Sequence, residues 1–389
     1  MFDKEESFAD AAIHLGITAD LTENVSAGVS VIGVSTLGLE NNLVSGTYSN
    51  AHTATTGTGA TFLGSSFTQP LNLGGVSVDD ELWVSEAWIA GTAFDTTLKA
   101  GRQAVDTPLA FTETWGIDKN TFEGAVLINQ SIPDTTIVAA WLGKSNGSAD
   151  DTAGVLNSIG GAAAGYVSEG GKFNTFAKDG AYAFGVINNS WKPLTAQAWA
   201  YDLQGLAKAY WVQADLDAEG VLAGFQYSRV DAVIDGYVDS NTYAVMAGYA
   251  MKDVVTVKAA FSKVESTDSL ALSIGAANTA TTSGQSKLYT EMWWNYGFVT
   301  LNNTEAMSLT AEMTVEGVDL LAGLYQSNYN DDILDAKMTE LTVAASKSFG
   351  PLDATVAYSY GDLDVSMDND TAGLRNKNHT LQVYLTYNF

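Results

Sequence analysis

Apolar and polar residues alternate one by one through many short segments of this chain. At its end, in 379–389, Leu381, Val383, Leu385 and Tyr387 form one row, and mostly polar residues stand between them. A side-chain period of two is that of a β-strand with one apolar and one polar face. We therefore predict a strand here whose two faces meet different surroundings.

The same alternation recurs upstream and pairs into hairpins. The clearest pair is 241–251 with 254–263, where Val257 and Phe261 lie on the opposite face from Lys258. A short polar turn joins the two segments, as in a β-hairpin. About seventeen such segments occur along the chain, so we predict an all-β fold.

The connections between these segments alternate between two kinds. Short turns join the members of each hairpin, and long polar loops join one hairpin to the next. This asymmetry is typical of a transmembrane antiparallel β-barrel with short periplasmic turns and long external loops. A sandwich or propeller would distribute its long loops more evenly, and a β-helix would show a fixed repeat. We predict a single barrel domain over 1–389, with long external loops at 38–80, 106–120, 145–178, 264–305 and 362–377.

The number of segments conflicts with closure of the barrel. The first connection is a short turn and the last is a long loop, so the first and last strands run in the same direction. Bacterial single-chain barrels have an even number of strands. We therefore expect eighteen strands in the barrel, the first being absent from this chain. The alternative is a strand overlooked in the region 289–300.

Composition narrows the class of protein. Although 46% of the residues are hydrophobic, no window approaches the ~18 apolar residues of a membrane helix. The net charge of −27 comes from 45 acids and 18 bases and excludes binding of nucleic acid through phosphate contacts. The chain has no cysteine, which excludes disulfides and thiolate metal sites. The first residues, MFDKEESF, are not a signal peptide, and an outer-membrane barrel needs one for export, so we expect a mature or truncated chain.

Two motifs resemble one known family. GRQAVDTPLAF (101–111) and NTFEGAVL (120–127) resemble the outer membrane porin D superfamily, and the hairpin layout is similar to the campylobacter-type major outer membrane porins of that superfamily. The resemblance implies an eighteen-stranded trimeric porin in the bacterial outer membrane. It also implies that the loop after the GRQ strand folds inward and narrows the pore. The terminal aromatic resembles the assembly signal of bacterial barrels, which assigns that role to Tyr387 and Phe389.

The resemblance places the pore constriction in the loop 106–120 and the strand before it. Opposed acids and bases across a pore set a transverse field, and rings of acids favour cations. The alternation leaves open whether Lys99 or Arg102 faces the lumen. The chain has only three arginines, which argues against an arginine ladder and for a general, cation-leaning diffusion pore. The predicted constriction residues are Lys99, Arg102, Asp106, Glu113 and Asp118.

The resemblance also implies a structural calcium ion between inward-folded loops. Calcium takes six to eight oxygen ligands, which a few carboxylates and backbone carbonyls can supply. The candidate ligands are Asp118, Asp150, Asp151 and Glu291, and their spacing is not that of an EF-hand. We expect no other cofactor. The expected partners are membrane lipid, lipopolysaccharide, small hydrophilic solutes, cations and two further copies of the chain.

Two other functions fit the long loops less fully. A surface adhesin or structural outer-membrane protein would have the same strand pattern. An outer-membrane lipid hydrolase would need a catalytic triad, but no GxSxG or HExxH motif stands in a suitable context among the three histidines and many serines. We therefore predict a porin that is not an enzyme.

Overall fold

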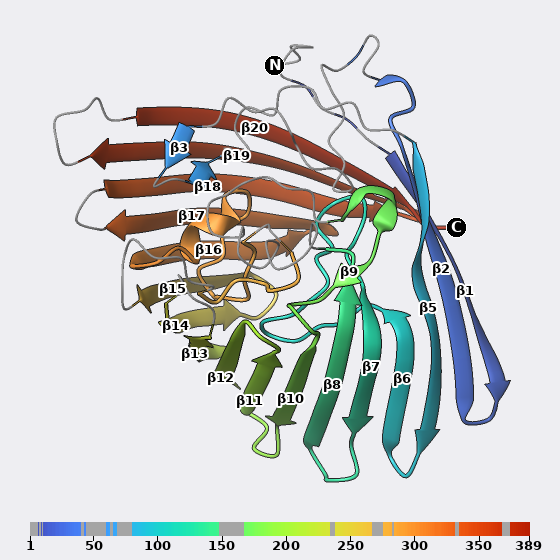
Figure 1. The fold of residues 1–389 in the computed structure, drawn as a ribbon. Coiled ribbons are helices and arrows are strands. Elements are labelled where there is room, and N and C mark those ends of the chain that lie inside the picture. Colours follow the sequence, from blue (N-terminus) through green and yellow to red (C-terminus); the bar gives the residue numbers. More distant parts are fainter. Residues whose placement is uncertain are drawn as a thin grey trace.

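The fold is one large antiparallel sheet that curves around an interior (Figure 1). The computed structural model describes residues 7, 9, 11–39, 43, 60–62, 65–67, 80–147, 167–233, 238–266, 275–281, 284–330, 334–367 and 374–389. The sheet has eighteen strands, one of which, β9, contains two residues. The strands of the sheet are β1 (Ala11–Thr22), β2 (Val25–Ser35), β5 (Glu81–Ala93), β6 (Thr96–Gln103), β7 (Phe122–Asn129), β8 (Thr135–Ser145), β9 (Asn174–Thr175), β10 (Ala181–Asn188), β11 (Leu194–Leu203), β12 (Ala207–Ala218), β13 (Val221–Ala232), β14 (Ser240–Met251), β15 (Val255–Ser266), β16 (Thr304–Val315), β17 (Val318–Asn330), β18 (Leu334–Phe349), β19 (Leu352–Met367) and β20 (Leu374–Tyr387).

Two kinds of short element lie outside this sheet. A separate pair of short strands, β3 (Ala60–Phe62) and β4 (Ser65–Phe67), forms between β2 and β5. Two 3-10 turns are η4 (Glu169–Gly171) and η5 (Tyr296–Val299). None of the helices among the described residues is long and apolar enough to cross a membrane.

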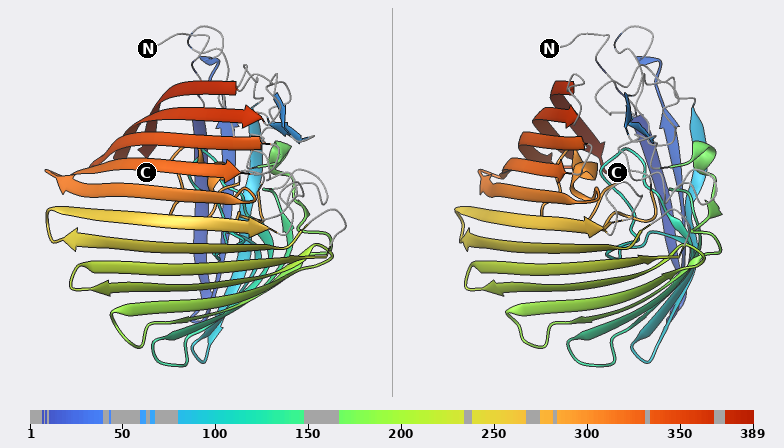
Figure 2. Two further views of the ribbon diagram at one scale, coloured as in Figure 1. Left: turned by 90° about the vertical axis from the view of Figure 1, so that its left-hand side faces the viewer. Right: turned by 60° about the vertical axis from the view of Figure 1, so that its left-hand side comes forward.

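The long strands follow one another around the sheet in chain order, which confirms the predicted all-β antiparallel fold (Figure 2). Sixteen antiparallel pairings lead from β1 to β20, so these two strands run in the same direction. Among the described residues, β1 pairs with β2 and β20 with β19, and no ladder joins β1 to β20. A strand that precedes β1 and completes an antiparallel closure remains a prediction.

The short turns lie at one end of the sheet, and those between β1 and β2, β5 and β6, and β7 and β8 are visible along the lower edge of Figure 1. Two of the turns consist of the pairs Glu219–Gly220 and Glu316–Gly317. All four residues have positive φ, at 52°, 88°, 51° and 72°. Positive φ at both central positions is the geometry of a type I′ turn, whose twist matches that of the flanking strands. The turn chemistry therefore keeps these hairpins tight.

The last predicted loop is shorter than the alternation indicated. In place of 362–377, the strands continue to Met367 in β19 and begin again at Leu374 in β20. Asp362 lies opposite Lys377 in this extension and accepts hydrogen bonds from Arg375 at 3.1 and 2.8 Å. The charged residues that looked like loop are cross-strand ion partners, and such pairs stabilise a ladder.

The two faces of the sheet have opposite character. In β14, Tyr243, Val245 and Tyr249 point outward and are exposed, whereas Ser240 and Thr242 point inward and are buried. A protein in water would bury the apolar row instead. The arrangement is that of a barrel whose outer face meets lipid. In β20 the outward row of Leu381, Val383, Leu385 and Tyr387 is likewise exposed, as predicted.

The interior contains a buried apolar cluster in which loop residues pack against the inner face of the wall. It includes Leu109 and Phe298 from the loops and Trp211 and Tyr325 from the strands. The loop 106–120 therefore folds inward, as the resemblance implies, and the described part of 264–305 enters the sheet as well, although it is predicted to be external. Figure 1 shows both on the concave side.

Candidate functional site

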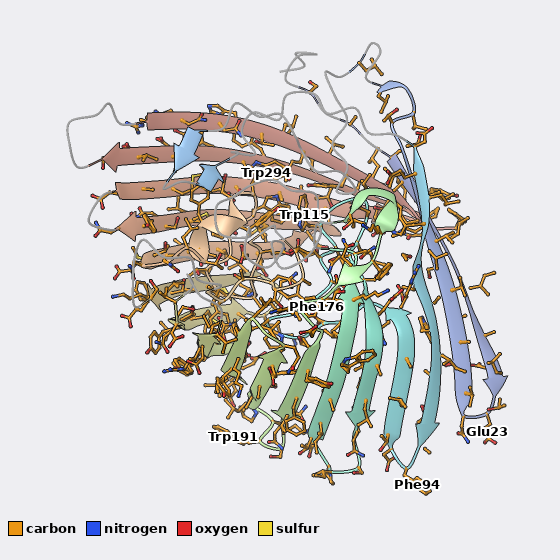
Figure 3. All side chains as sticks on the ribbon, in the orientation of Figure 1. Glu23, Phe94, Trp115, Phe176, Trp191 and Trp294 are labelled. Carbon is orange, nitrogen blue, oxygen red and sulfur yellow. The ribbon has the colours of Figure 1, made fainter. Side chains whose placement is uncertain are left out.

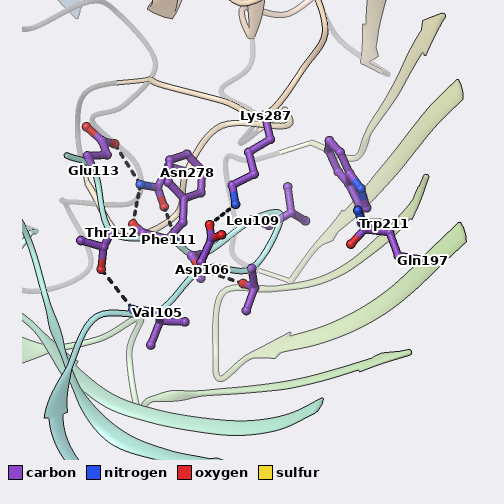
Figure 4. A network of polar contacts seen from close by, with 12 residues as sticks. Val105, Asp106, Leu109, Phe111, Thr112, Glu113, Gln197, Trp211, Asn278 and Lys287 are labelled. Atoms are coloured by element: carbon purple, nitrogen blue, oxygen red, sulfur yellow. Dashed lines mark hydrogen bonds and ion pairs between the residues drawn. The ribbon is translucent and has the colours of Figure 1, made fainter. Parts of the chain in front are cut away.

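Two chain segments meet on the concave side of the sheet. The first inner loop (104–121) connects β6 to β7, and the second inner loop (275–281 and 284–303) belongs to the connection between β15 and β16. Figure 4 shows their contact. The Phe111 backbone N–H donates to Asn278 Oδ1 at 3.0 Å, and Asn278 Nδ2 donates to the Phe111 carbonyl at 2.9 Å. The Thr279 N–H donates to the Leu109 carbonyl at 2.8 Å, so one backbone bond and the two bonds of the Asn278 side-chain amide hold the loops together.

Glu113 joins the same two loops through its side chain. Its carboxylate is 3% exposed, and Oε1 accepts hydrogen bonds from Asn278 Nδ2 at 2.9 Å and from the Thr281 hydroxyl. Asn120 Oδ1 accepts the Glu113 backbone N–H at 2.7 Å. A buried carboxylate that is hydrogen-bonded in this way is costly to disturb. This predicted constriction residue therefore acts at the contact between the loops.

Asp106 makes a second connection between the loops, of a different kind. Its carboxylate forms an ion pair with Lys287 of the second inner loop, and the Lys287 ammonium also lies 5.0 Å from the centre of the Phe111 ring (Figure 4). The Asp106 side chain is 84% exposed. An ion pair in such a solvated position contributes little to stability. Asp106 is thus a charge presented to the solvent between the loops.

The second inner loop is fixed to the wall by Glu340 of β18, which is fully buried. Its carboxylate accepts the successive backbone N–H groups of Trp293 at 3.0 Å, Trp294 at 3.1 Å and Asn295 at 2.8 Å. The Asn295 side-chain amide and the Thr342 hydroxyl also donate to it, at 2.8 and 2.9 Å. Consecutive N–H groups that converge on one anion form a strong binding concavity.

Neighbouring strands hold the other end of this loop. Gln226 of β13 accepts the Tyr289 N–H at 3.1 Å and donates to the Lys287 carbonyl at 2.8 Å. The Tyr289 ring lies so close to Gly224 that a Cβ there would be 2.5 Å from the ring, so the position requires glycine. Ser308 of β16 donates to the Tyr289 carbonyl at 3.2 Å. These contacts explain why polar residues on the inward rows of β13, β16 and β18 are buried.

Lys99 and Arg102 lie on opposite faces of β6. Lys99 pairs in register with Ala90 and faces inward, where its ammonium lies 4.2 Å from the centre of the Trp88 ring. Arg102 shares the face of the exposed Leu98 and donates to Glu123 of β7 at 2.8 Å. The register resolves the ambiguity of the sequence and places only Lys99 on the concave side, so Arg102 is not part of the inner site.

A further ion pair lies near Lys99. Lys119 of the first inner loop contacts Glu86 of β5 at 2.5 Å, and both side chains are largely buried. Glu86 pairs in register with Ser30, on the same inward row as the buried Ile32. Neither Lys119 nor Glu86 is among the constriction residues predicted from the sequence. Lys119 neutralises one acid here and leaves Lys99 as an additional positive charge.

The four candidate calcium ligands are not brought together by the described residues. Asp118 is buried in the first inner loop, and Glu291 lies in the second, where its Oε2 accepts the Ser286 N–H at 2.8 Å. Burial raises the pKa of Glu291 well above its usual range, and the charges of Glu113 and Glu340 add to the rise. Asp150 and Asp151 lie outside the described residues. Within the described part of the chain, no group of three or more acids or histidines could hold a metal ion, so the calcium site stays a prediction.

The role of the second inner loop is not evident from the sequence, apart from its apolar cluster 292–294. The indole rings of Trp115 and Trp294, one from each loop, meet edge to face at 6.5 Å (Figure 3). Three consecutive apolar or aromatic residues in a polar loop are the signal that could have indicated burial. Their partners, such as Glu340, are too distant in the chain for a periodic pattern to reveal.

Three comparisons bear on this architecture. The chain matches the family model of the outer membrane porins, OprD family, over residues 88–330, which is more than half of its length. None of the curated protein sequences matches it.

Among solved structures, the chain is similar to OccD3 (OpdP) of Pseudomonas aeruginosa, with 14% identity, a TM-score of 0.63 and coverage of 97% of this chain and 86% of that one. OccAB4 of Acinetobacter baumannii has 12% identity, a TM-score of 0.65 and coverage of 97% and 90%. OccK1 (OpdK) of Pseudomonas aeruginosa has 12% identity, a TM-score of 0.64 and coverage of 97% and 91%. At these identities the likeness concerns the fold alone.

Proposed function

Because the chain belongs to the OprD family of outer membrane porins, we propose that it forms a passive, cation-leaning diffusion channel narrowed by its two inner loops. As a member of that family the chain is a protein of the bacterial outer membrane and not an enzyme. The observation that carries the proposal is the docking of both inner loops on the concave side. Loops that occupy a lumen reduce its cross-section and bring their charges to the path of solutes.

The contacts of the loops support narrowing. The bonds of Leu109 and Phe111 with Thr279 and the Asn278 side chain join the loops, and Glu340 and Gln226 attach the second of them to the wall. Each bond closes a long stretch of chain against a rigid sheet, which opposes movement of the loops out of the lumen. We infer that the narrowing is permanent under ordinary conditions.

The charge balance around the loops supports cation preference. Burial favours the neutral form of Glu291, because it raises the pKa of that side chain. Without Glu291, six carboxylates and three ammonium groups lie in or against the two inner loops, and an excess of acids along a pore enriches cations. The carboxylates are Glu86, Asp106, Glu113, Asp118, Asp215 and Glu340, and the ammonium groups are Lys99, Lys119 and Lys287.

The first test is the reversal potential of purified protein in a planar bilayer under a salt gradient. We expect its sign to indicate cation preference, and we expect Asp106→Asn to reduce that preference because it removes an exposed charge and leaves Lys287 unneutralised. Asp253→Asn, in a short turn at the far end of the sheet, is the matched control and should leave the potential unchanged. Anion preference in the unaltered protein would contradict the proposal.

The alternative function, a surface adhesin or structural outer-membrane protein, makes a different prediction in the same bilayer. It requires no continuous aqueous path, so purified protein would insert without ohmic conductance. Ohmic conductance of the purified protein without any added ligand would support the channel over the adhesin.

The finer predictions from the resemblance remain proposals. These are kinship with the campylobacter-type branch, a homotrimer, contact with lipopolysaccharide and the calcium ion. We propose the trimer and the lipid contact as features of the assembled channel. Calcium is not required for passive diffusion through the path described here.

We also propose that Tyr387 and Phe389 act as the assembly signal. Phe389 is 86% exposed beyond the end of β20, and its ring stacks on that of Tyr387 with centroids 6.4 Å apart. Deletion of Phe389 is expected to leave most of the protein outside the outer membrane, as measured by membrane fractionation of expressing cells. Phe94→Ala, which alters a turn residue that is 95% exposed, is the control and should assemble normally. Normal assembly without Phe389 would refute the assignment.

A further inference from the structure

The outward face of the sheet has a band of basic residues at the end where the long loops leave. We call these residues the outer basic band. Each shares its strand face with exposed apolar or aromatic residues, such as Tyr210 for Lys208 and Leu381 for Lys377. The band comprises Arg102, Lys144, Lys208, Arg229, Lys263, Lys337, Arg375 and Lys377.

The band is unusual for so acidic a chain. The whole sequence contains 45 acids and 18 bases, whereas among the described residues of the band eight acids accompany eight bases. The described part of this band thus contains nearly half of the bases of the chain and less than a fifth of its acids. Such a distribution indicates that the belt faces an anionic environment. The acids are Glu123, Asp202, Asp231, Glu265, Glu305, Asp335, Asp362 and Asp364.

The most exposed cluster of the band lies on β18, β19 and β20. Lys337, Asp364 and Arg375 stand in register across the three strands, and Asp362 stands beside them opposite Lys377. The Asp362 side chain is 16% exposed, whereas those of Arg375 and Lys377 are 58% and 53% exposed. The carboxylate therefore lies beneath the cations and holds them side by side. The side chains of Arg375 and Lys377 extend further from the sheet than the Asp362 carboxylate does.

The donors of this cluster are only partly used. Arg375 donates through Nε and Nη2 to Asp362, at 3.1 and 2.8 Å, and among the described residues its Nη1 hydrogens have no hydrogen-bond acceptor, so they can donate to a ligand. The Lys377 ammonium is 3.9 Å from Asp362, too far for a strong bond. Guanidinium and ammonium groups that project together suit the oxygens of a phosphate.

The residues next to the cluster, toward the middle of the strands, indicate that the ligand is a membrane lipid. Toward the middle of the strands, Tyr358 donates to or accepts from His379 Nδ1 at 2.7 Å, and the Tyr360 ring lies 5.0 Å from that of His379. The next outward residues, Leu381 and Val383, are apolar and exposed. The order of charged, aromatic and apolar residues along the strands matches the headgroup, interface and hydrocarbon of a membrane leaflet.

We propose that Lys337, Arg375 and Lys377 bind the phosphate group of a phosphorylated lipid of the outer leaflet, whose acyl chains pack against the apolar residues below. The proposal deepens the lipopolysaccharide contact proposed above, and it rests on the proposed function in taking the long-loop end of the barrel as the outer one. Charge complementarity and the adjoining apolar surface select a lipid, because a free phosphate would make no use of Leu381 and Val383. The acids of the band keep the cations separated and oriented when no lipid is bound.

The test uses purified full-length protein in detergent micelles, with a bisphosphorylated, acylated glucosamine disaccharide as the probe lipid. Bound lipid is counted by native mass spectrometry across a titration. The triple variant K337Q/R375Q/K377Q is expected to bind about tenfold more weakly, since three charge-assisted contacts are lost. The matched control K192Q/K252Q/K347Q removes three cations at the short-turn end and should bind like the unaltered protein.

Further arms separate the lipid from other sources of phosphate. The dephosphorylated lipid should bind weakly to all proteins, and inorganic phosphate at equal concentration should not displace the bisphosphorylated lipid. Equal binding by the unaltered protein and the triple variant, or full displacement by inorganic phosphate, would overturn the proposal. A circular dichroism spectrum typical of β-strands establishes that each variant is folded. The variant K337Q/R375Q/K377R, which keeps a cation at position 377, should bind more lipid than the triple variant does. Conductance in a neutral bilayer is a separate readout, because its absence would contradict the channel and not the lipid site.

Discussion

Replacement of Glu340 by alanine is expected to release the second inner loop and to raise the single-channel conductance severalfold. The carboxylate accepts the N–H groups of Trp293, Trp294 and Asn295 in a fully buried position. Without it these donors have no partner at the wall, and each unsatisfied buried donor costs about 1–3 kcal/mol. The loop can satisfy them by moving into water, which widens the path. Single-channel recording in planar bilayers measures the change, and increased current noise is expected with it.

The control for this prediction is Glu312→Gln. Glu312 is also an inward carboxylate, but its ion-pair partner is Lys258 of the neighbouring strand, at 3.4 Å. The substitution alters the charge of the lumen without removing an anchor of the loop, so it should shift selectivity slightly and leave the conductance near its original value. Glu340→Gln retains one acceptor oxygen and should give an intermediate conductance. If Glu340→Ala conducts like the unaltered protein, the loop is not held at this point.

The alternation along the chain was sufficient to predict the sheet, because each strand repeats one local rule. Val383 and Leu385 face outward, as their period indicated, and the lipid-facing row is visible from neighbouring residues alone. The rule failed where the strands rise above the apolar layer. There Asp362, Arg375 and Lys377 face outward too, so the outward row is polar and its sequence resembles that of a loop.

The site was less predictable, because its contacts join distant parts of the chain. Asn278 reaches Glu113 across 165 residues, and Trp293 reaches Glu340 across 47. No spacing or period encodes such pairs. The motif resemblance located the first inner loop because that loop directly follows a matched strand, but it gave no information on the second. Which of Lys99 and Arg102 points inward likewise depends on the register between β5 and β6, and the sequence of one strand alone does not determine that register.

Val245→Arg is expected to prevent stable insertion of the barrel. Val245 is 48% exposed, lies halfway along β14, and stands between Phe225 and Phe261 on the outward face of the neighbouring strands. An arginine at the bilayer midplane costs about 2–4 kcal/mol, and the cost falls to about 0–1 near the interfaces. The loss can be measured as a lower urea midpoint of unfolding in lipid vesicles. Met251→Arg, on the same row but beside a short turn, is the matched control and should cost much less.

The difference between these two variants tests the placement of the sheet in the membrane. Both positions are exposed and apolar, at 48% and 50%, so an aqueous protein would tolerate the two arginines equally. Only a medium whose polarity changes with depth distinguishes them. Equal stability of the two variants would therefore contradict a lipid-facing outer surface, and a large loss confined to Val245→Arg would place the middle of β14 within the hydrocarbon layer.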